Sequence, residues 1–242
     1  MYSILKKELN AFFTSPIAYL VIGVYLVING LFLWVFEGDF NILHAGFADL
    51  NSYFFLAPWI FIFLIPAITM RSFSDEYSAG TIEILKTKPI GNWNIILGKF
   101  LSALILVFIA ILPTLIYVFS VYQLGNPVGN IEFGTTFGSF IGLLFLAASY
   151  CAIGIFTSTL SKNQIVAFIV AVFICFFFYY GFEALASYNL FGNSDYIVQQ
   201  FGMREHFNSL SKGVIDTRDL IYFLSIVFFF LVLTNFNIKN ES

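Results

Sequence analysis

The chain has 242 residues, of which 60% are hydrophobic and only 10% are charged, with a formal net charge of −3. Soluble domains carry about 25% charged residues, so this composition excludes an ordinary water-soluble domain. No polybasic run indicates binding to nucleic acid. Long uncharged runs alternate with short polar segments, and a run of about 18 residues is long enough to span a membrane. We therefore expect an all-α, multi-pass membrane protein.

The segment before the first apolar run has the pattern of an amphipathic helix. Its apolar residues recur at helical spacing: Ile4, Leu5, Leu9, Phe12 and Phe13. Lys6 and Lys7 fall on the opposite face. This arrangement predicts a helix that lies on the inner leaflet, with a frayed tail as the alternative. The apolar run that follows is too long for a cleavable signal peptide, so we expect it to be retained as a span.

Six apolar runs are candidates for membrane spans. They cover residues 17–36, 53–70, 100–122, 137–157, 165–188 and 220–236. The second contains Pro58 and Pro66, which membrane helices tolerate as kinks. The fourth contains Gly138 and Gly142, a spacing of small residues that favours close helix contacts. We expect residues 1–242 to form a single transmembrane domain.

The positive charges are distributed unequally between the two sides. Six spans place both termini on one side, together with eight of the eleven basic residues: Lys6, Lys7, Arg71, Lys86, Lys88, Lys99, Lys162 and Lys239. The other side holds only Arg204, Lys212 and Arg218. Because Lys and Arg are enriched in cytoplasmic loops, this bias predicts that both termini are cytoplasmic.

The longest predicted inner loop, between the second and third runs, has signs of internal order. Ser72 followed by Asp75 resembles a capping box, which predicts the start of a short helix. Gly80 is typical of a helix end, and Thr81 is a suitable cap for a second helix over residues 82–88. We expect a glycine-hinged pair of helices that forms a docking surface, with a stiff connector as the alternative.

The outer segment 189–219 is too polar to span, but its apolar residues have helical spacing. This predicts an interfacial or partly re-entrant helix. Glu183 is the one acidic residue within a predicted span. We expect it to reach the interface or to pair with Arg204 or Arg218, and a substrate site is the alternative.

The sequence lacks the motifs of an enzyme. The nearest match to a phosphate-binding loop runs from Gly91 to Gly98 and Lys99, but its second glycine comes two residues late. The residue after the lysine is Phe100 rather than Ser or Thr, and a span follows at once. We therefore expect no catalytic residues in this chain and no hydrolysis of ATP by it alone.

Cysteine and histidine are equally uninformative about chemistry. Cys151 and Cys175 both lie inside apolar runs, which favours small core residues over a disulfide or a metal site. His44 and His206 lie in predicted outer loops, where we expect them to be solvated. We expect no metal and no cofactor.

Three segments resemble the ABC-2 type permease family. They are the inner loop from Arg71 through Gly80 to Lys99, the stretch 157–164, and the start of the chain at residues 4–16. The similarity extends over essentially the whole chain, and it looks closest to the gliding-motility-associated permeases. It implies six transmembrane helices, an N-terminal elbow helix and outer re-entrant helices, in a bacterial cytoplasmic (inner) membrane.

The resemblance also implies partners and contact residues. The loop between spans two and three would hold a coupling helix for a separate ABC ATPase subunit. A second permease, identical or homologous, would be the other partner. The contact with the ATPase would involve Phe73, Glu76, Tyr77, Gly80 and Thr81, and the elbow helix would pack through Leu5, Leu9 and Phe12.

The function that this resemblance implies is that of the permease subunit of an ABC transporter, for export and with a link to gliding motility. One alternative is a non-transporting membrane scaffold of a motility or secretion machine. A second alternative is an ion-coupled carrier, which is weakened by the lack of acidic residues in the middle of the spans.

Overall fold

The computed structural model describes the chain except for residues 82–90, 189–194, 214–215 and 241–242. The described residues form helices and connecting turns, without a β-strand among them. Six helical segments are long and apolar enough to cross a membrane: Pro16–Val35, Asn51–Ser78, Asn92–Leu124, Phe133–Ser158, Gln164–Ser187 and Thr217–Lys239. The predicted all-α fold with six spans is therefore confirmed.

The spans are built from the following elements. Span 1 is α2 (Pro16–Gly30) with the π-helical η1 (Leu31–Val35), span 2 is α3 (Asn51–Thr69) with α4 (Arg71–Ser78), and span 3 is α6 (Asn92–Ile111), the 3₁₀ turn η2 (Leu112–Thr114) and α7 (Leu115–Leu124). Span 4 is α8 (Phe133–Ser158), span 5 is α9 (Gln164–Phe176), the π-helical η3 (Phe177–Gly181) and α10 (Phe182–Ser187), and span 6 is α13 (Thr217–Asn240). Three shorter helices lie outside the spans: α1 (Tyr2–Thr14), α11 (Asp195–Gln199) and α12 (Met203–Ser211).

Helix α8 is the central element of the bundle, since it contacts α3, α6, α9, α12 and α13. Its small residues allow this close packing. A Cβ atom added to Gly154 would overlap the Thr69 hydroxyl of α3, and one added to Gly138 would overlap the Leu210 carbonyl of α12. The close helix contacts predicted for Gly138 and Gly142 in span 4 are thus present, with α12 as their partner.

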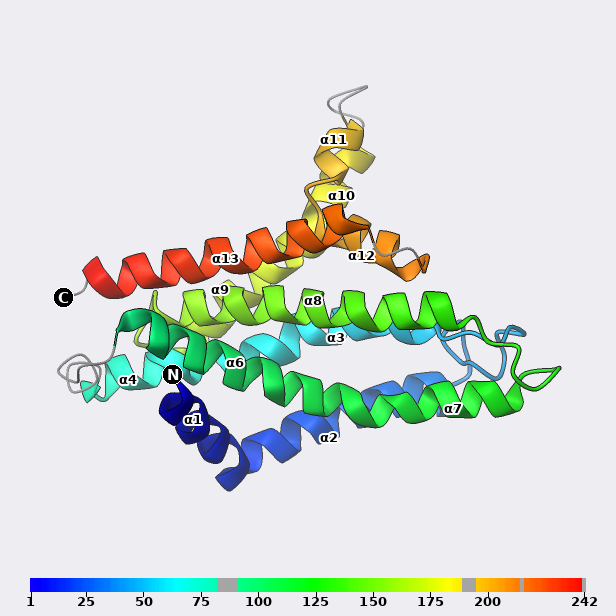
Figure 1. Ribbon diagram of the computed structural model, residues 1–242, viewed down its shortest axis with the longest axis horizontal. Coiled ribbons are helices and arrows are strands. Elements are labelled where there is room, and N and C mark those ends of the chain that lie inside the picture. The colour runs from blue at the N-terminus through cyan, green and yellow to red at the C-terminus, as the bar shows by residue number, and fades with distance from the viewer. Residues whose placement is uncertain (82–90, 189–194, 214–215, 241–242) are drawn as a thin grey trace.

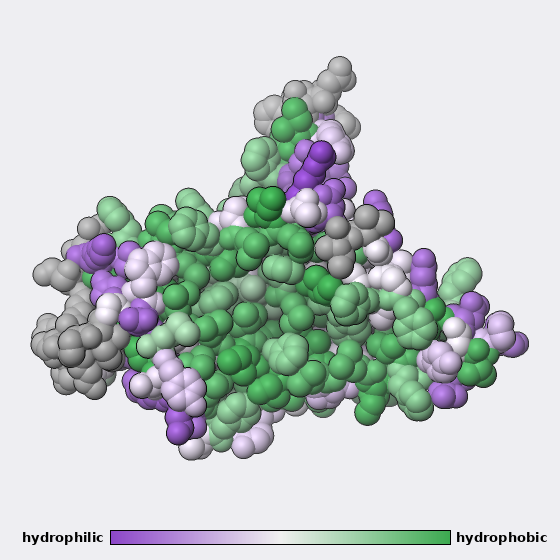
Figure 2. All heavy atoms as spheres, viewed as in Figure 1, coloured by the Kyte–Doolittle hydropathy of each residue, from purple (hydrophilic) through white to green (hydrophobic). Residues whose placement is uncertain are grey.

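Both termini lie at the same end of the bundle, beside α1 and α4 (Figure 1). We call this the terminal end. Helices α10 and α11 project sideways from the bundle, and α12 lies along it near the other end (Figure 1). Figure 2 shows hydrophobic side chains over the middle of the molecule and hydrophilic ones at the two ends and on the projection. This distribution is typical of a protein that crosses a bilayer.

Two local features differ from the sequence pattern. The helix that contains the predicted run 100–122 already begins at Asn92, and Lys99 lies inside this helix, α6, with its side chain buried. The capping box at Ser72 and Asp75 does not form: the chain passes from α3 into α4 in helical conformation at Met70, and Ser72 lies within the helix. The predicted helix over 82–88 lies outside the described residues.

Other details agree with the sequence. Gly80 ends α4 with a φ of +67°, the left-handed conformation that favours glycine. Cys151 and Cys175 are free and buried. The outer segment contains the helices α11 and α12, as its spacing predicted.

Candidate functional site

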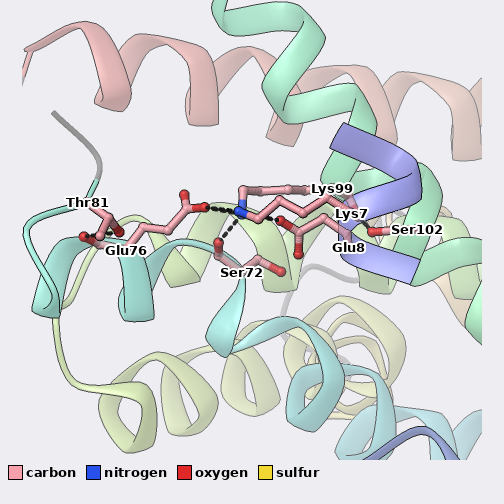
Figure 3. Close-up of polar contacts among 7 residues, drawn as sticks. All are labelled: Lys7, Glu8, Ser72, Glu76, Thr81, Lys99 and Ser102. Atoms are coloured by element: carbon pink, nitrogen blue, oxygen red, sulfur yellow. Dashed lines mark hydrogen bonds and ion pairs between the residues drawn. The ribbon is translucent and has the colours of Figure 1, made fainter. Parts of the chain in front are cut away.

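The ammonium group of Lys99 is the centre of a polar cluster at the terminal end. Its side chain is 2% exposed, and Nζ donates to Glu8 Oε1 at 3.0 Å, Glu76 Oε1 at 2.9 Å and the Ser72 carbonyl at 2.6 Å (Figure 3). The Phe73 ring lies 5.0 Å from the nitrogen. A lysine has three N–H donors, so all of them are satisfied. This pairing allows the charge to stay buried, since an unpaired buried charge is very costly.

The three oxygens come from two helices. Glu8 lies on the elbow helix α1, while Glu76 and the Ser72 carbonyl belong to α4. Lys7 adds a more exposed charge, with Nζ 3.6 Å from Glu76 Oε1. Lys99 therefore joins α1, α4 and the start of α6 at one point, which we call the Lys99 junction.

Glycine brings the elbow helix close enough to reach this junction. A Cβ atom added to Gly98 would lie 2.8 Å from Ile4 Cγ2 and 3.4 Å from the Leu5 backbone nitrogen. Ile4 is buried in this contact. Because residues four apart lie on the same face of a helix, seating Ile4 against Gly98 places Glu8 beside Lys99.

Helix α4 also forms hydrogen bonds with residues at the connection between spans 4 and 5. The Ser74 hydroxyl donates to the Ser158 carbonyl at 3.0 Å, and the Gln164 amide donates to Asp75 Oδ1. Asn237 near the end of span 6 donates to Thr159 Oγ1 at 3.0 Å. The stretch 157–164 and the inner loop, which both resembled the same family, are thus in contact.

The residues predicted to contact an ATPase lie on one helix and its terminal turn, but they do not share one surface. Phe73 is fully buried, and the Glu76 carboxylate faces Lys99. Tyr77 is half-buried against the core. Gly80 and Thr81 are exposed, and the Thr81 hydroxyl donates to the Glu76 carbonyl at 3.4 Å. Of these five predicted contact residues, only Gly80 and Thr81 are exposed.

The predicted elbow residues Leu5, Leu9 and Phe12 are all partly buried, while Lys6 and Lys7 are exposed. The amphipathic helix that the spacing predicted is therefore present as α1. Its fully seated residue is Ile4, which the sequence did not single out as the main contact.

Sequence reasoning missed the residues that form the junction. Glu8 was not singled out, and Lys99 was considered as a loop charge, as part of a failed nucleotide motif and as the end of a segment that resembles the family, but not as a buried residue. One signal was available: a lysine that directly follows a glycine at the edge of a long apolar run needs an acidic partner if its helix continues. Which carboxylates supply that partner is not readable from spacing.

Two further predictions concern charged residues at the other end. Arg204 pairs with Glu183 at 2.7 Å, which confirms one of the two partners that were predicted. The expectation that His206 is solvated was wrong: its ring is 17% exposed and lies between Asp219 and the Gln200 carbonyl. Within the described residues, no group of three or more His, Cys, Asp or Glu side chains is placed to hold a metal ion.

A family model described as ABC-2 family transporter protein matches residues 2–236. The chain belongs to the ABC-2 transporter family. A search of curated proteins gives no significant match. The family match, together with six apolar helices, makes this chain a multi-pass membrane protein and a permease subunit of an ABC transporter, a transport component that is not itself catalytic.

Proposed function

We propose that a separate ABC ATPase drives this ABC-2 permease by docking on its terminal end. The observation that carries the proposal is the Lys99 junction. Because one buried ammonium group binds carboxylates of α1 and α4, a force applied to α4 passes directly to the elbow helix and to span 3. Helix α4 is joined to α3 without a flexible linker, since the chain stays helical through Met70.

The surface at this end also supports a docked protein. A cleft of about 330 Å³ lies between α1 and α4, and its walls carry charges of both signs from Lys7, Arg71 and Asp75. The exposed turn at Gly80 and Thr81 lies at the tip of α4. In this proposal the turn makes the first contact, while Phe73 and Glu76 hold α4 in position from inside.

The replacement Gly80→Val tests this docking. Valine resists the φ of +67°, and a strained backbone residue costs about 1–3 kcal/mol, so the turn should shift. The full chain is expressed in its native membrane, solubilised in mild detergent and assayed for retained ATPase and for ATP hydrolysis. We expect retention to fall about tenfold, which corresponds to about 1.4 kcal/mol.

Gly46→Val is the matched control. Gly46 has a φ of +73° in the loop between spans 1 and 2, and a Cβ atom at either glycine meets nothing within 4 Å. The control should insert normally and keep its ATPase. If Gly80→Val inserts and retains the ATPase as well as Gly46→Val does, the docking site is wrong, and the scaffold alternative becomes the better account.

The proposal places both termini in the cytoplasm, on the side with the excess of basic residues. The bacterial inner membrane, export as the direction of transport and a link to gliding motility rest on the resemblance of the sequence alone.

A second membrane subunit completes the proposed complex. Spans 1 and 5 are the least covered, with 28% and 22% of an apolar 18-residue stretch buried, against 61–67% of the corresponding stretches in spans 2, 3 and 4. An apolar groove of about 520 Å³ lies between α2, α3 and α9. If the complex is a homodimer, a cysteine in place of Val24, in a background without Cys151 and Cys175, should form a disulfide with the same cysteine of the second copy. ATPase-bound chains that are exclusively monomeric would contradict this arrangement.

A further inference from the structure

The imidazole ring of His206 lies between two hydrogen-bond acceptors on the side away from the termini. Its Nε2 is 2.8 Å from the Gln200 carbonyl oxygen, and its Nδ1 is 2.7 Å from Asp219 Oδ1. The ring also stacks on Tyr222, with the two centroids 3.8 Å apart. His206 belongs to α12, Asp219 to α13 and Gln200 to the turn after α11. One ring thus joins three parts of the outer segment.

The two contacts of the ring need one more hydrogen than neutral His206 and ionised Asp219 carry together. A carbonyl oxygen only accepts, so Nε2 must have the hydrogen. The contact at Nδ1 then needs a second hydrogen, either on the ring, which makes it imidazolium, or on the Asp219 carboxyl. Neutral histidine beside ionised aspartate lacks this hydrogen, and one of the two contacts would then bring lone pairs together.

We propose that His206 and Asp219 form a proton-binding site that holds α12 against the bundle. While the proton is bound, the ring keeps its contacts with both Gln200 and Asp219. When the proton is lost as pH rises, one of these contacts breaks. Asp219 is 5% exposed, and its Oδ2 has no hydrogen-bond partner among the described residues. The site is therefore shielded from water, which strengthens the mutual dependence of the two groups.

Few charged groups lie on the elements around the ring. Helices α8 and η3, which pack against α12, contain no Asp, Glu, Lys, Arg or His, and their titratable side chains are Tyr150, Cys151, Tyr179 and Tyr180. On α12 and α13 and in the nearby turn, the remaining charged groups are Arg204 with Glu183, Glu205 with the Gln199 amide, Asp216 with the Arg218 backbone, and the exposed side chains of Lys212, Arg218 and Lys239. Tyr222 donates its hydroxyl to the Phe201 carbonyl at 2.6 Å.

The consequence of proton loss lies in the packing of α12. Leu210 and Phe207 of this helix seat against Gly138 and Gly142 of α8, and both are buried. Breaking a contact of His206 releases α12 from α13 or from the α11 turn. Alkaline conditions should therefore loosen the cover over the outer half of span 4.

The test uses the full chain in lipid nanodiscs between about pH 5.5 and 8.5, the range in which histidine normally titrates. The chain has two histidines, so nitrogen NMR in a His44→Gln background reports on His206 alone. A spin label on Asn208→Cys, in a Cys151→Ala and Cys175→Ala background, reports whether α12 is held. We expect loss of the proton and a rise in label mobility over the same pH interval.

Asp219→Asn is the matched variant. Its amide donates to Nδ1 while Nε2–H still donates to Gln200, so a neutral ring keeps both contacts. The label should stay immobile across the whole pH range. A wild-type label whose mobility does not follow the loss of the proton overturns the proposal, and so does a wild-type site without the extra proton at any pH in the range.

Discussion

Lys99 keeps its charge in a nearly water-free place because three oxygen atoms surround its ammonium group. The Ser102 hydroxyl donates to the Lys99 carbonyl at 2.7 Å, which adds a local bond to this turn of α6. The side chains of Glu8 and Glu76 are only 15% and 13% exposed. Each charge of the junction therefore depends on the others.

Replacing Lys99 by methionine should be strongly destabilising. The change removes the buried cation of the junction and leaves two carboxylates close together, with only the exposed Lys7 ammonium, among the described cations, within 4 Å of them. Breaking a buried ion pair costs about 3–5 kcal/mol. Thermal unfolding in detergent should show this loss as a lower midpoint. Lys6→Met, which removes an exposed charge from the same end, should leave the midpoint unchanged.

A triple variant separates charge imbalance from loss of packing. Lys99→Met combined with Glu8→Gln and Glu76→Gln removes the three buried charges of the junction, and neutral replacements of a buried ionic cluster are often tolerated. We expect it to recover most of the stability. A triple variant as unstable as Lys99→Met alone would contradict the electrostatic account of the junction.

The residues of this junction mark the limit of sequence reasoning at this scale. Glu8 and Lys99 are 91 positions apart, and Glu76 and Lys99 are 23 apart. No periodicity relates such positions, because the pairing depends on how α1 crosses α6. The helix end at Gly80, in contrast, follows from local preference and was predicted.

The elbow helix depends on the absence of a side chain at Gly98. Gly98→Val would push Ile4 and Leu5 away from α6. Overpacking of this kind costs about 1–3 kcal/mol, so we expect α1 to detach while the spans remain folded. Hydrogen exchange should show loss of protection confined to α1.

Gly23→Val controls for the effect of valine in a membrane helix. Gly23 lies in α2, and a Cβ atom there meets nothing within 4 Å. This variant should keep the protection of α1. If both variants protect α1 equally, close contact at Gly98 is not what seats the elbow helix.

Element boundaries were predicted well where charge marks the end of a span and poorly where a charge is buried. The predicted run 137–157 lies within α8, whose ends are polar. The predicted run 100–122 started late, because Lys99 was counted as a loop residue although Glu8 and Glu76 neutralise it. Hydropathy records the residue type, whereas burial depends on partners that are distant in sequence.

At the scale of the whole molecule, the six spans and the bias of the basic residues predict that the end with both termini faces the cytoplasm. Cysteines at Phe47 and Asn130 should react with an impermeant thiol reagent from outside, and those at Ser78 and Asn163 should not. All four positions are exposed, whereas Asn41 is unsuitable because it is 3% exposed. The background lacks Cys151 and Cys175. Labelling of Ser78 from outside would reverse the proposed orientation.

The number of spans was readable from composition because the bilayer imposes a length on each apolar run. The order of packing was not readable. Nothing in the hydropathy of span 4 indicates that α8 is central, or that Gly138 receives the Leu210 carbonyl of an outer helix. Those contacts depend on how the surfaces of neighbouring helices fit together, and the pattern of small residues indicates only where a close approach is possible.

The central claim is that an ABC ATPase docks at the turn that ends α4. A photo-crosslinking side chain in place of Thr81, which is exposed there, tests this in native membranes. We predict a crosslinked product that contains an ATP-binding protein, with none from the same group placed at Phe47. Two results would contradict the account. One is a crosslink between an ATPase and the group placed at Phe47, and the other is no crosslink from the group placed at Thr81 in membranes where the ATPase is bound.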